Sequence, residues 1–493
     1  MTELMFWNRV NTDGTGDFVH AFELFNAARK HEGLSKKYNF TLIIVIGVDG
    51  EKLNASWKKH YERFKQQIES LNLPADRCYF GTYEEVESQL RSPEFQARCL
   101  LARQHISISQ PTNLLLKQPI APEATVKYIL EHESNGFEPL FYDKLLVRHM
   151  GLAPRKYGIK VPTIDILSPQ DALSQLPQED PNFWHVLSSH TKSDNPGVLL
   201  ENNLLFTAYL SDARSLTRFL PLITSNPSLP KYKNIILYYS SAQDGVSLIE
   251  YFRKEVLPAC SRMESIKEIE LIEKNGDTIH TDIIKMHPEG KVLRIFCNFR
   301  VNNAAFNALF SAAMLVGVSG DTSFERAVAF QKLPFYFSNN YSFKRETLVG
   351  LQRIIMNADL GIPESIKQDF ITYFKYEEKW SGPIETPCQR LTELKNLDLT
   401  GMCAEWPKIA SYLREHFNLY TFLPQLIEEV LTAEQDLYNE ARHPHIYGLT
   451  ASHQTDSPLV QHSVFAKPTT AKATAADAPA PPKTWWDWLP KFG

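Results

Sequence analysis

Short apolar runs alternate with amphipathic stretches along the first third of the chain, and this pattern predicts strands followed by helices. In the first predicted helix, for example, Phe18, Phe22 and Phe25 share one face. Parallel strands need a crossover helix between them, so the alternation predicts a parallel α/β sheet. The expected strand and helix pairs are Leu4–Val10 with Asp17–Lys30, Thr41–Val48 with Leu53–Leu71, and Arg77–Phe80 with Tyr83–Leu90.

The pattern is less regular in the second hundred residues. We expect a helix near Glu123–His132 and shorter elements around it. Asn203–Leu210 is interpreted as the last strand of this half, with a helix over Asp212–Thr224 after it. The polar, proline-marked segment Ser225–Pro230 then predicts a linker.

After this segment the strand and helix alternation begins again. A helix is expected over Asn303–Ala313, and a second helix is expected to begin after the turn Ser319–Ser323. Two α/β halves of similar size around a short linker predict two Rossmann-like domains facing a cleft. The strands expected in this half are Asn234–Tyr239, Ile266–Ile272, Val292–Cys297, Met314–Val318 and Leu333–Phe337.

The domain boundaries follow from these signals. We expect Rossmann-like domains over residues 1–224 and 231–362, and a mainly helical segment over 363–446 that packs across both. Residues 447–493 are rich in Ala, Pro and Thr, which is typical of a flexible tail. The tail ends in a segment containing Trp485, Trp486 and Trp488, aromatic residues that could bind a partner.

Composition and charge narrow the functional classes. A net charge of −5 gives no basic surface, so no nucleic-acid partner is expected. The six cysteines lack C-x-x-C spacing, which disfavours a zinc site or a disulfide framework. The amino terminus has no signal-peptide pattern, and no apolar run is long enough for a transmembrane segment. We expect a cytoplasmic location, with export as an effector into another cell as the alternative.

The first glycine turn, Arg9–Asp17, joins the first predicted strand to the first predicted helix. Gly14 and Gly16 allow a tight turn and close approach of a ligand, and Asp13 and Asp17 place two carboxylates beside it. Asp17 could equally be the N-cap of the helix. The spacing differs from the G-x-G-x-x-G dinucleotide fingerprint, so the turn alone is a weak signal.

The second glycine turn precedes another helix and suits an anion. Ser319, Gly320, Asp321 and Ser323 are candidates for contacts to a diphosphate or a ribose, together with the backbone amides from Thr322 to Phe324. Thr322 and Glu325 also match a capping box, with Thr322 as the N-cap. Arg326 could add positive charge or form an ordinary salt bridge.

Two further positions lie at the ends of predicted strands. Ser240 could line the predicted cleft, although ordinary loop chemistry explains it just as well. Phe299 could stack on a base, but a buried aromatic is the favoured explanation of this residue. The sequence contains no D-x-D triplet, H-E-x-x-H, Walker A or G-x-S-x-G motif. We therefore expect no metal ion and no cofactor apart from a nucleotide diphosphate-sugar used as a substrate.

With both turns considered, the chain resembles the bacterial protein-arginine rhamnosyltransferases, which are inverting, metal-independent glycosyltransferases of the GT-B fold. That family has an Asp-Asn-Phe-Gly-Asp turn, and residues 13–17 keep both aspartates at the same spacing. It also has the motif Arg-Gly-Glu-Asp-Ser-Phe-Val-Arg-Ala, which matches residues 319–327. Ser319, Asp321 and Thr322 replace the family's Arg, Glu and Asp, so the sugar and the base stay open.

The resemblance implies that Asp13 and Asp17 handle the acceptor while the second turn binds the nucleotide-sugar donor. An arginine side chain of a protein would then be one expected acceptor. Two other classes stay open. A sugar-nucleotide epimerase or hydrolase of the same fold would turn over the donor without an acceptor. A non-catalytic binding or effector protein would show no thermal shift with nucleotide-sugars.

Overall fold

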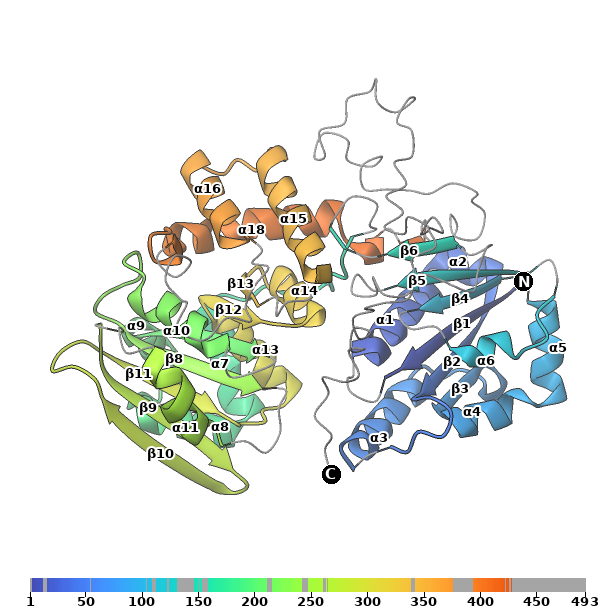
Figure 1. Ribbon diagram of the computed structural model, residues 1–493, viewed down its shortest axis with the longest axis horizontal. Coiled ribbons are helices and arrows are strands. Elements are labelled where there is room, and N and C mark those ends of the chain that lie inside the picture. Colours follow the sequence, from blue (N-terminus) through green and yellow to red (C-terminus); the bar gives the residue numbers. More distant parts are fainter. Residues whose placement is uncertain are drawn as a thin grey trace, which may run out of the picture. The chain divides into compact units, whose positions relative to one another are not determined.

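The computed structural model describes residues 2–427 with several gaps, and the two sheets are shown in Figure 1. Asp13 and Gly14 of the first turn, and the tryptophans of the tail, lie outside the described residues. The positions within 2–427 that are not described are 12–15, 54, 103, 109–111, 122–123, 131–145, 150, 153–157, 211–214, 242–246, 260–262, 264, 338–341, 376–392, 422 and 425–426.

The first sheet has six strands in the order β3-β2-β1-β4-β5-β6, and all neighbouring pairs are parallel. β1 lies inside the sheet and is apolar on both faces, as buried parallel strands usually are. The strands are β1 (Thr2–Val10), β2 (Tyr38–Ile46), β3 (Cys78–Thr82), β4 (Gln104–Ile108), β5 (Thr125–Leu130) and β6 (Leu146–His149).

Helices cover both faces of this sheet. Leu4 and Phe6 of β1 pack in one buried cluster with residues of α1 and α3, whereas Met5 and Trp7 pack in another with residues of α4 and α5. This split follows from the alternation of side chains along a strand. The helices are α1 (Gly16–Lys30), α2 (Glu32–Lys37), α3 (Ala55–Glu69), α4 (Tyr83–Leu90), α5 (Pro93–Leu101) and α6 (Asn113–Leu116), with a short 3₁₀ turn over Ala75–Arg77.

The second sheet has seven strands in the order β10-β9-β11-β8-β7-β12-β13. Only the pair of β9 and β10 is antiparallel among its described pairings. The strands are β7 (Asn203–Leu210), β8 (Asn234–Ser241), β9 (Ile266–Asn275), β10 (Thr278–Lys285), β11 (Lys291–Cys297), β12 (Leu315–Val318) and β13 (Leu333–Tyr336).

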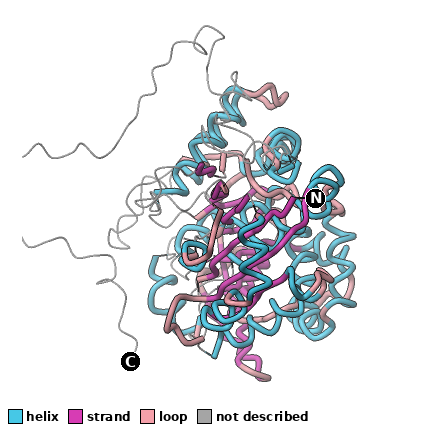
Figure 2. Tube along the Cα trace, turned by 90° about the vertical axis from the view of Figure 1, so that its right-hand side faces the viewer, coloured by secondary structure: helices cyan, strands magenta, loops and turns pink. Residues whose placement is uncertain are grey.

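Helices also cover both faces of the second sheet. Figure 2 shows the molecule from the side of the first sheet, with strands in magenta between helices in cyan. α7, α8 and α13 pack on one face, and α10, α14 and the later helices pack on the other. The helices are α7 (Pro169–Glu179), α8 (Pro181–Thr191), α9 (Pro196–Asn202), α10 (Leu216–Ser225), α11 (Leu248–Tyr251), a π turn over Phe252–Val256, α12 (Leu257–Ala259), α13 (Asn303–Ala312), α14 (Asp321–Ala329), α15 (Ser342–Asn357), α16 (Glu364–Tyr373) and α18 (Leu399–His416).

The expected α/β class with two mainly parallel, Rossmann-like sheets is confirmed, but three segments differ from the prediction. Asn203–Leu210 is a strand, yet it pairs with β8 and β12 and so belongs to the second sheet. The boundary expected at residue 224 therefore falls inside the second α/β unit. The predicted linker is a structured turn, because the buried Asn226 side chain donates hydrogen bonds to the carbonyls of Leu394 and Leu397.

The third difference is local. The segment Glu123–His132, expected as a helix, contains β5 instead. β5 pairs with both β4 and β6. These neighbouring strands favour the extended conformation, and the residue pattern of β5 alone does not reveal them.

The C-terminal helices contact both cores. Trp406 of α18 is buried in the core of the second sheet. Beyond α18, Leu419, Leu423 and Ile427 are buried in the core of the first sheet. The backbone of Ile159 pairs here with Phe417 and Leu419, through N–O distances of 2.9 and 2.8 Å. The chain thus passes between its two α/β parts twice at the same place.

Candidate functional site

The first candidate turn lies at the carboxyl end of β1. α1 begins at Gly16, so Asp17 is the second residue of the helix and not the residue before it. The Asp17 carboxylate accepts a hydrogen bond from the backbone N–H of Asn11 at 3.2 Å, and its backbone oxygen accepts one from the Asn8 amide at 3.3 Å. Asp17 is only partly buried. The turn therefore holds a half-exposed carboxylate at the carboxyl edge of the first sheet.

The second candidate turn lies between β12 and α14. Gly320 is the N-cap, and the Ser323 hydroxyl accepts a hydrogen bond from Gly320 N–H at 3.2 Å and donates one to its carbonyl at 2.7 Å. The predicted capping box of Thr322 and Glu325 is therefore wrong. Glu325 instead accepts a hydrogen bond from the backbone N–H of Lys160 at 2.9 Å. A long-range partner replaces the local one.

The residues of the second turn differ in exposure. Ser319 is buried, Gly320 and Asp321 are half-buried, and Thr322 is exposed. The Tyr336 hydroxyl donates a hydrogen bond to the Asp321 carboxylate. Burial, and then the negative charge of Asp321, raise the pKa of Tyr336 well above its usual range. Tyr336 therefore stays protonated and fixes the Asp321 carboxylate as an acceptor.

Phe324 is a core residue and not a ligand contact. Its side chain is fully buried, with its ring centroid 4.9 Å from that of Tyr336, and its N–H donates to the Gly320 carbonyl at 3.0 Å. An α-helix presents the backbone amides of its first turn to a ligand, and in α14 these are the amides of residues 321–323, which precede Phe324. The expectation that the Phe324 amide binds the diphosphate is therefore wrong.

The ends of two further strands meet this turn. Tyr209, at the end of β7, is in register with Val318 of β12 on one side and with Ser240 of β8 on the other. Tyr209 is 37% exposed, and Ser240 is half-buried. Since neighbouring parallel strands end together, Tyr209, Ser240 and the Gly320 turn share the carboxyl edge of the sheet. Tyr209 was not predicted as a site residue, because its strand was assigned to the other half of the chain.

Arg326 supplies a cation close to this edge. Its guanidinium carbon lies 5.4 Å from the centroid of the Phe306 ring, and the Tyr209 ring lies 6.5 Å from the same ring. Burial lowers the pKa of Arg326, while the charges of Glu23 and Tyr209 oppose this shift. An arginine remains protonated under such conditions, so Arg326 places a partly desolvated positive charge near the Gly320 turn.

Phe299, expected to stack on a base, is a core residue. It is 4% exposed, and its ring packs edge-on against Phe183 with centroids 5.1 Å apart. Its backbone oxygen accepts a hydrogen bond from the Tyr238 hydroxyl at 2.6 Å. A ring enclosed in this way offers no open face to a base, so the structural interpretation of Phe299 holds.

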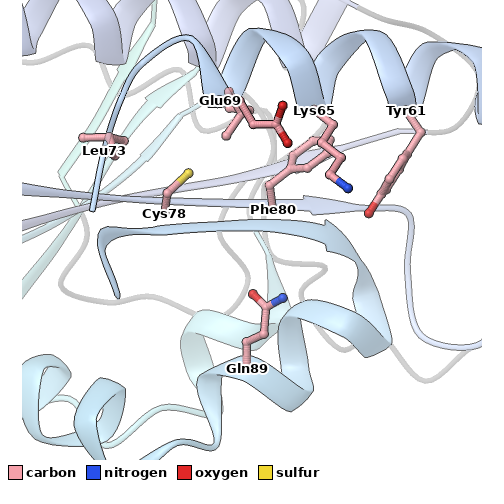
Figure 3. Close-up of a pocket in the computed structure, with 8 residues that line it drawn as sticks. Tyr61, Lys65, Glu69, Leu73, Cys78, Phe80 and Gln89 are labelled. Atoms are coloured by element: carbon pink, nitrogen blue, oxygen red, sulfur yellow. The ribbon is translucent and has the colours of Figure 1, made fainter. Parts of the chain in front are cut away.

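A separate cavity lies beside β3, at the edge of the first sheet (Figure 3). Its volume is about 230 Å³, and its lining contains none of the predicted site residues. The residues that line it are Tyr61, Lys65, Ile68, Glu69, Leu73, Cys78, Phe80 and Gln89. The two glycine turns thus remain the candidate site on chemical grounds.

In the part of the chain that the structure describes, no group of three or more His, Cys, Asp or Glu side chains is arranged to hold a metal ion. No described helix is long and apolar enough to cross a membrane. The first turn contributes the Asp17 carboxylate to the described chemistry of the site. The second contributes amides, hydroxyls, a guanidinium and the Asp321 carboxylate, which accepts a hydrogen bond from Tyr336.

Comparisons with known proteins were made for the whole chain. No protein-family model matches it, and no curated protein matches it. Solved structures do. HepE from Anabaena in complex with UDP-glucose is 11% identical, with 87% of this chain and 99% of that chain covered and a TM-score of 0.41. A UDP-forming trehalose-phosphate synthase from Burkholderia vietnamiensis is 11% identical, with 88% and 97% covered and a TM-score of 0.41.

A third solved structure is described as the basis for EarP-mediated arginine glycosylation of translation elongation factor EF-P. It is 13% identical to this chain, covers 87% of it and 99% of its own length, and gives a TM-score of 0.36. These identities and TM-scores are low. The function of this protein is therefore inferred from its own side chains.

Proposed function

We propose that this protein is an inverting glycosyltransferase that moves a sugar from a nucleotide diphosphate-sugar to an acceptor without a metal ion. The observation that carries the proposal is the Gly320 turn. It puts the amino end of α14 at the carboxyl edge of a parallel sheet, where such folds bind phosphate groups. Arg326, Tyr209 and Ser240 surround that edge with groups suited to a diphosphate and a ribose.

In the proposed reaction, a nucleophilic atom of the acceptor attacks the anomeric carbon of the sugar. The bond from that carbon to the diphosphate oxygen breaks, and the nucleoside diphosphate leaves with the electron pair. The acceptor proton passes to a carboxylate, which we assign to Asp17 or Asp13. The amides at the start of α14 and the Arg326 guanidinium offset the charge that develops on the leaving group.

We propose further that the acceptor is an arginine side chain of a protein. This rests on the resemblance of residues 13–17 and 319–327 to the arginine-modifying family. A carboxylate can hold a guanidinium bidentately and offset its charge, so an acidic turn suits this acceptor.

The test of donor binding uses the exposed residue of the second turn. Thr322→Glu adds a negative charge in the first turn of α14, which favours the helix but repels a diphosphate. We expect the affinity for a nucleotide diphosphate-sugar to fall about 10-fold or more, with the melting temperature unchanged or higher. Thr322→Ser is the matched control, because it keeps the charge and the hydroxyl.

Binding is measured by calorimetry with UDP-glucose, GDP-mannose and dTDP-rhamnose. A CMP-sugar serves as the comparison, because it carries a single phosphate in place of the diphosphate and should bind most weakly. If none of the diphosphate donors binds the wild type, or if the best of them binds Thr322→Glu as tightly as the wild type, the proposal is refuted.

A further inference from the structure

A buried lysine connects the two helices that carry the candidate turns. Lys160 is 3% exposed, and its Nζ lies 3.6 Å from Glu325 Oε2 of α14 and 3.9 Å from Glu23 Oε2 of α1. Its backbone N–H also donates to Glu325 Oε1 at 2.9 Å. A buried ammonium group is costly unless opposite charges compensate it, so the two carboxylates are needed in place.

The carboxylate on α1 has two further neighbours. The Tyr420 hydroxyl donates a hydrogen bond to Glu23 Oε2 at 2.7 Å, and burial together with Glu23 raises the pKa of Tyr420. Glu23 also acts electrostatically on Arg326 of α14. Lys160, Tyr420 and residues of α1 and α14 thus meet around one pair of carboxylates.

The position of this cluster matters because both helices begin at a candidate turn. Glu23 lies about 9 Å along α1 from Asp17, and Glu325 lies about 6 Å along α14 from Asp321, at the usual rise per residue. A helix is stiff over such lengths. Fixing Glu23 relative to Glu325 therefore restricts how far the Asp17 carboxylate can move relative to the Gly320 turn.

We infer that Lys160 is a positioning residue for the proposed transfer. It holds α1 and α14 so that the Asp17 carboxylate, which acts on the acceptor, faces the donor bound at the Gly320 turn. This inference rests on the proposed function. Lys160 acts through Glu23 and Glu325 and touches no substrate. Loss of a purely structural lysine would weaken donor binding and the chemical step alike. Loss of Lys160 should slow the chemical step more than it weakens donor binding, because the Gly320 turn keeps its Ser323 cap and its hydrogen bond from Tyr336.

The test compares Lys160→Met with Lys160→Arg. Methionine keeps much of the volume and the apolar stem but removes the charge, whereas arginine keeps the charge. Donor affinity is measured by calorimetry with whichever of UDP-glucose, GDP-mannose and dTDP-rhamnose binds the wild type. The transfer rate is measured as release of the nucleoside diphosphate with an arginine-containing peptide as acceptor.

For Lys160→Met we expect kcat to fall about 10- to 100-fold while the donor Kd stays within about twofold. This is expected because misplacing the reacting groups slows the chemical step without removing contacts to the donor. Lys160→Arg should recover most of the lost rate. Glu23→Gln combined with Lys160→Met should be no worse than Lys160→Met alone, because both remove the same connection. A folded Lys160→Met protein with wild-type kcat, or one whose donor Kd rises as much as kcat falls, would overturn the positioning role.

A measurement without substrate separates this inference from the proposed function. Hydrogen exchange of the free protein should become faster in α1 and around residues 158–161 in Lys160→Met and not in Lys160→Arg. If exchange in these segments is unchanged, the positioning role is refuted even when transfer is observed. If the wild type binds no diphosphate donor and releases no diphosphate, the proposed function fails, whatever the exchange result.

Discussion

The two candidate turns share one topology but are built with different chemistry. Each follows a strand inside a parallel sheet and begins a helix on its carboxyl edge. In the first, the Asp17 carboxylate accepts a hydrogen bond from Asn11 and remains partly exposed. In the second, the Ser323 hydroxyl caps the helix, and the carboxylate of Asp321 is bound by Tyr336. Both turns thus carry a carboxylate, but that of Asp321 is already bound by Tyr336, and the second turn adds the amide groups at the start of α14. This difference suits the turns to opposite ends of one reaction.

The largest expected effect concerns the acid turn. Asp17→Asn keeps an oxygen that can accept from Asn11 N–H, so the turn should fold, but it removes the negative charge. If Asp17 takes the acceptor proton, kcat should fall about 10²- to 10⁴-fold, with donor affinity little changed. Steady-state rates of nucleoside diphosphate release test this. A rate within about threefold of wild type would remove Asp17 from the chemistry.

The second prediction concerns the junction through which the halves carrying the two turns are connected. Gly158 has φ +95°, and a Cβ there would lie 2.3 Å from the Phe417 carbonyl oxygen. Gly158→Ala should therefore lower the free energy of unfolding by about 3 kcal/mol or more, since the left-handed backbone and the collision with main chain both oppose it.

The matched control is Gly276→Ala. Gly276 has φ +59° but nothing within 4 Å of the added Cβ. Only the cost of a left-handed backbone should therefore lower the free energy of unfolding, by about 1 kcal/mol. Urea unfolding of both variants gives the comparison. Equal losses in the two variants would mean that the close approach at Phe417 does not contribute.

The third prediction uses a buried histidine on β4, the strand that pairs with β1. Trp7 Nε1 of β1 donates a hydrogen bond to His105 Nδ1 at 3.2 Å, and burial lowers the pKa of His105 from 6.5 to about 4. The folded protein keeps this ring neutral while the unfolded chain takes up a proton below its own pKa. The stabilisation is therefore complete above pH about 6.5 and is lost as the pH falls toward about 4, by about 3 kcal/mol in all.

Stability measured by urea unfolding between pH 7 and pH 4 tests this contribution. His105→Asn keeps an acceptor near the Trp7 indole but does not titrate in this range. The variant should lose less stability than the wild type over the same interval. Parallel curves for the two proteins would show that His105 is not held neutral in the native state.

The smallest effect is expected at the donor turn. Tyr336→Phe removes the hydrogen bond to the Asp321 carboxylate and should lower the free energy of unfolding by about 2 kcal/mol, as the loss of bonds to charged groups does. Tyr79→Phe is the comparison, because that hydroxyl donates to the neutral carbonyl of Asp76 at 2.9 Å and should cost less. Thermal unfolding measures both. A Tyr336→Phe protein as stable as the wild type would show that Asp321 is not anchored by this bond.

The sequence pattern identified the local elements around both turns well. The expected strands Leu4–Val10 and Met314–Val318 and the helix Asp17–Lys30 agree with β1, β12 and α1 to within one or two residues. The helix expected after the turn Ser319–Ser323 is also present as α14, although it begins at Asp321, inside that turn. This is because each is a strong apolar run that ends at a glycine turn.

What the pattern could not predict was which strands pair and which distant residues meet. Alternation identifies Asn203–Leu210 as a strand but does not say that β8 and β12 are its neighbours, so Tyr209 was not recognised beside the donor turn. The capping box failed for the same reason, since Glu325 is used by Lys160, which lies far away in the sequence. The roles of Tyr209 and Lys160 depend on tertiary contacts alone.

The most direct test of the account is an amide NMR titration of the protein with UDP, GDP and dTDP, each compared with its nucleoside. The account predicts that a diphosphate shifts the amide signals of Gly320, Asp321, Thr322 and Ser323, while the nucleoside does not. Phe324, whose N–H is bonded to Gly320 within the helix, should shift less. If every diphosphate leaves these amides unchanged, or binds only at residues remote from the start of α14, the central claim is contradicted.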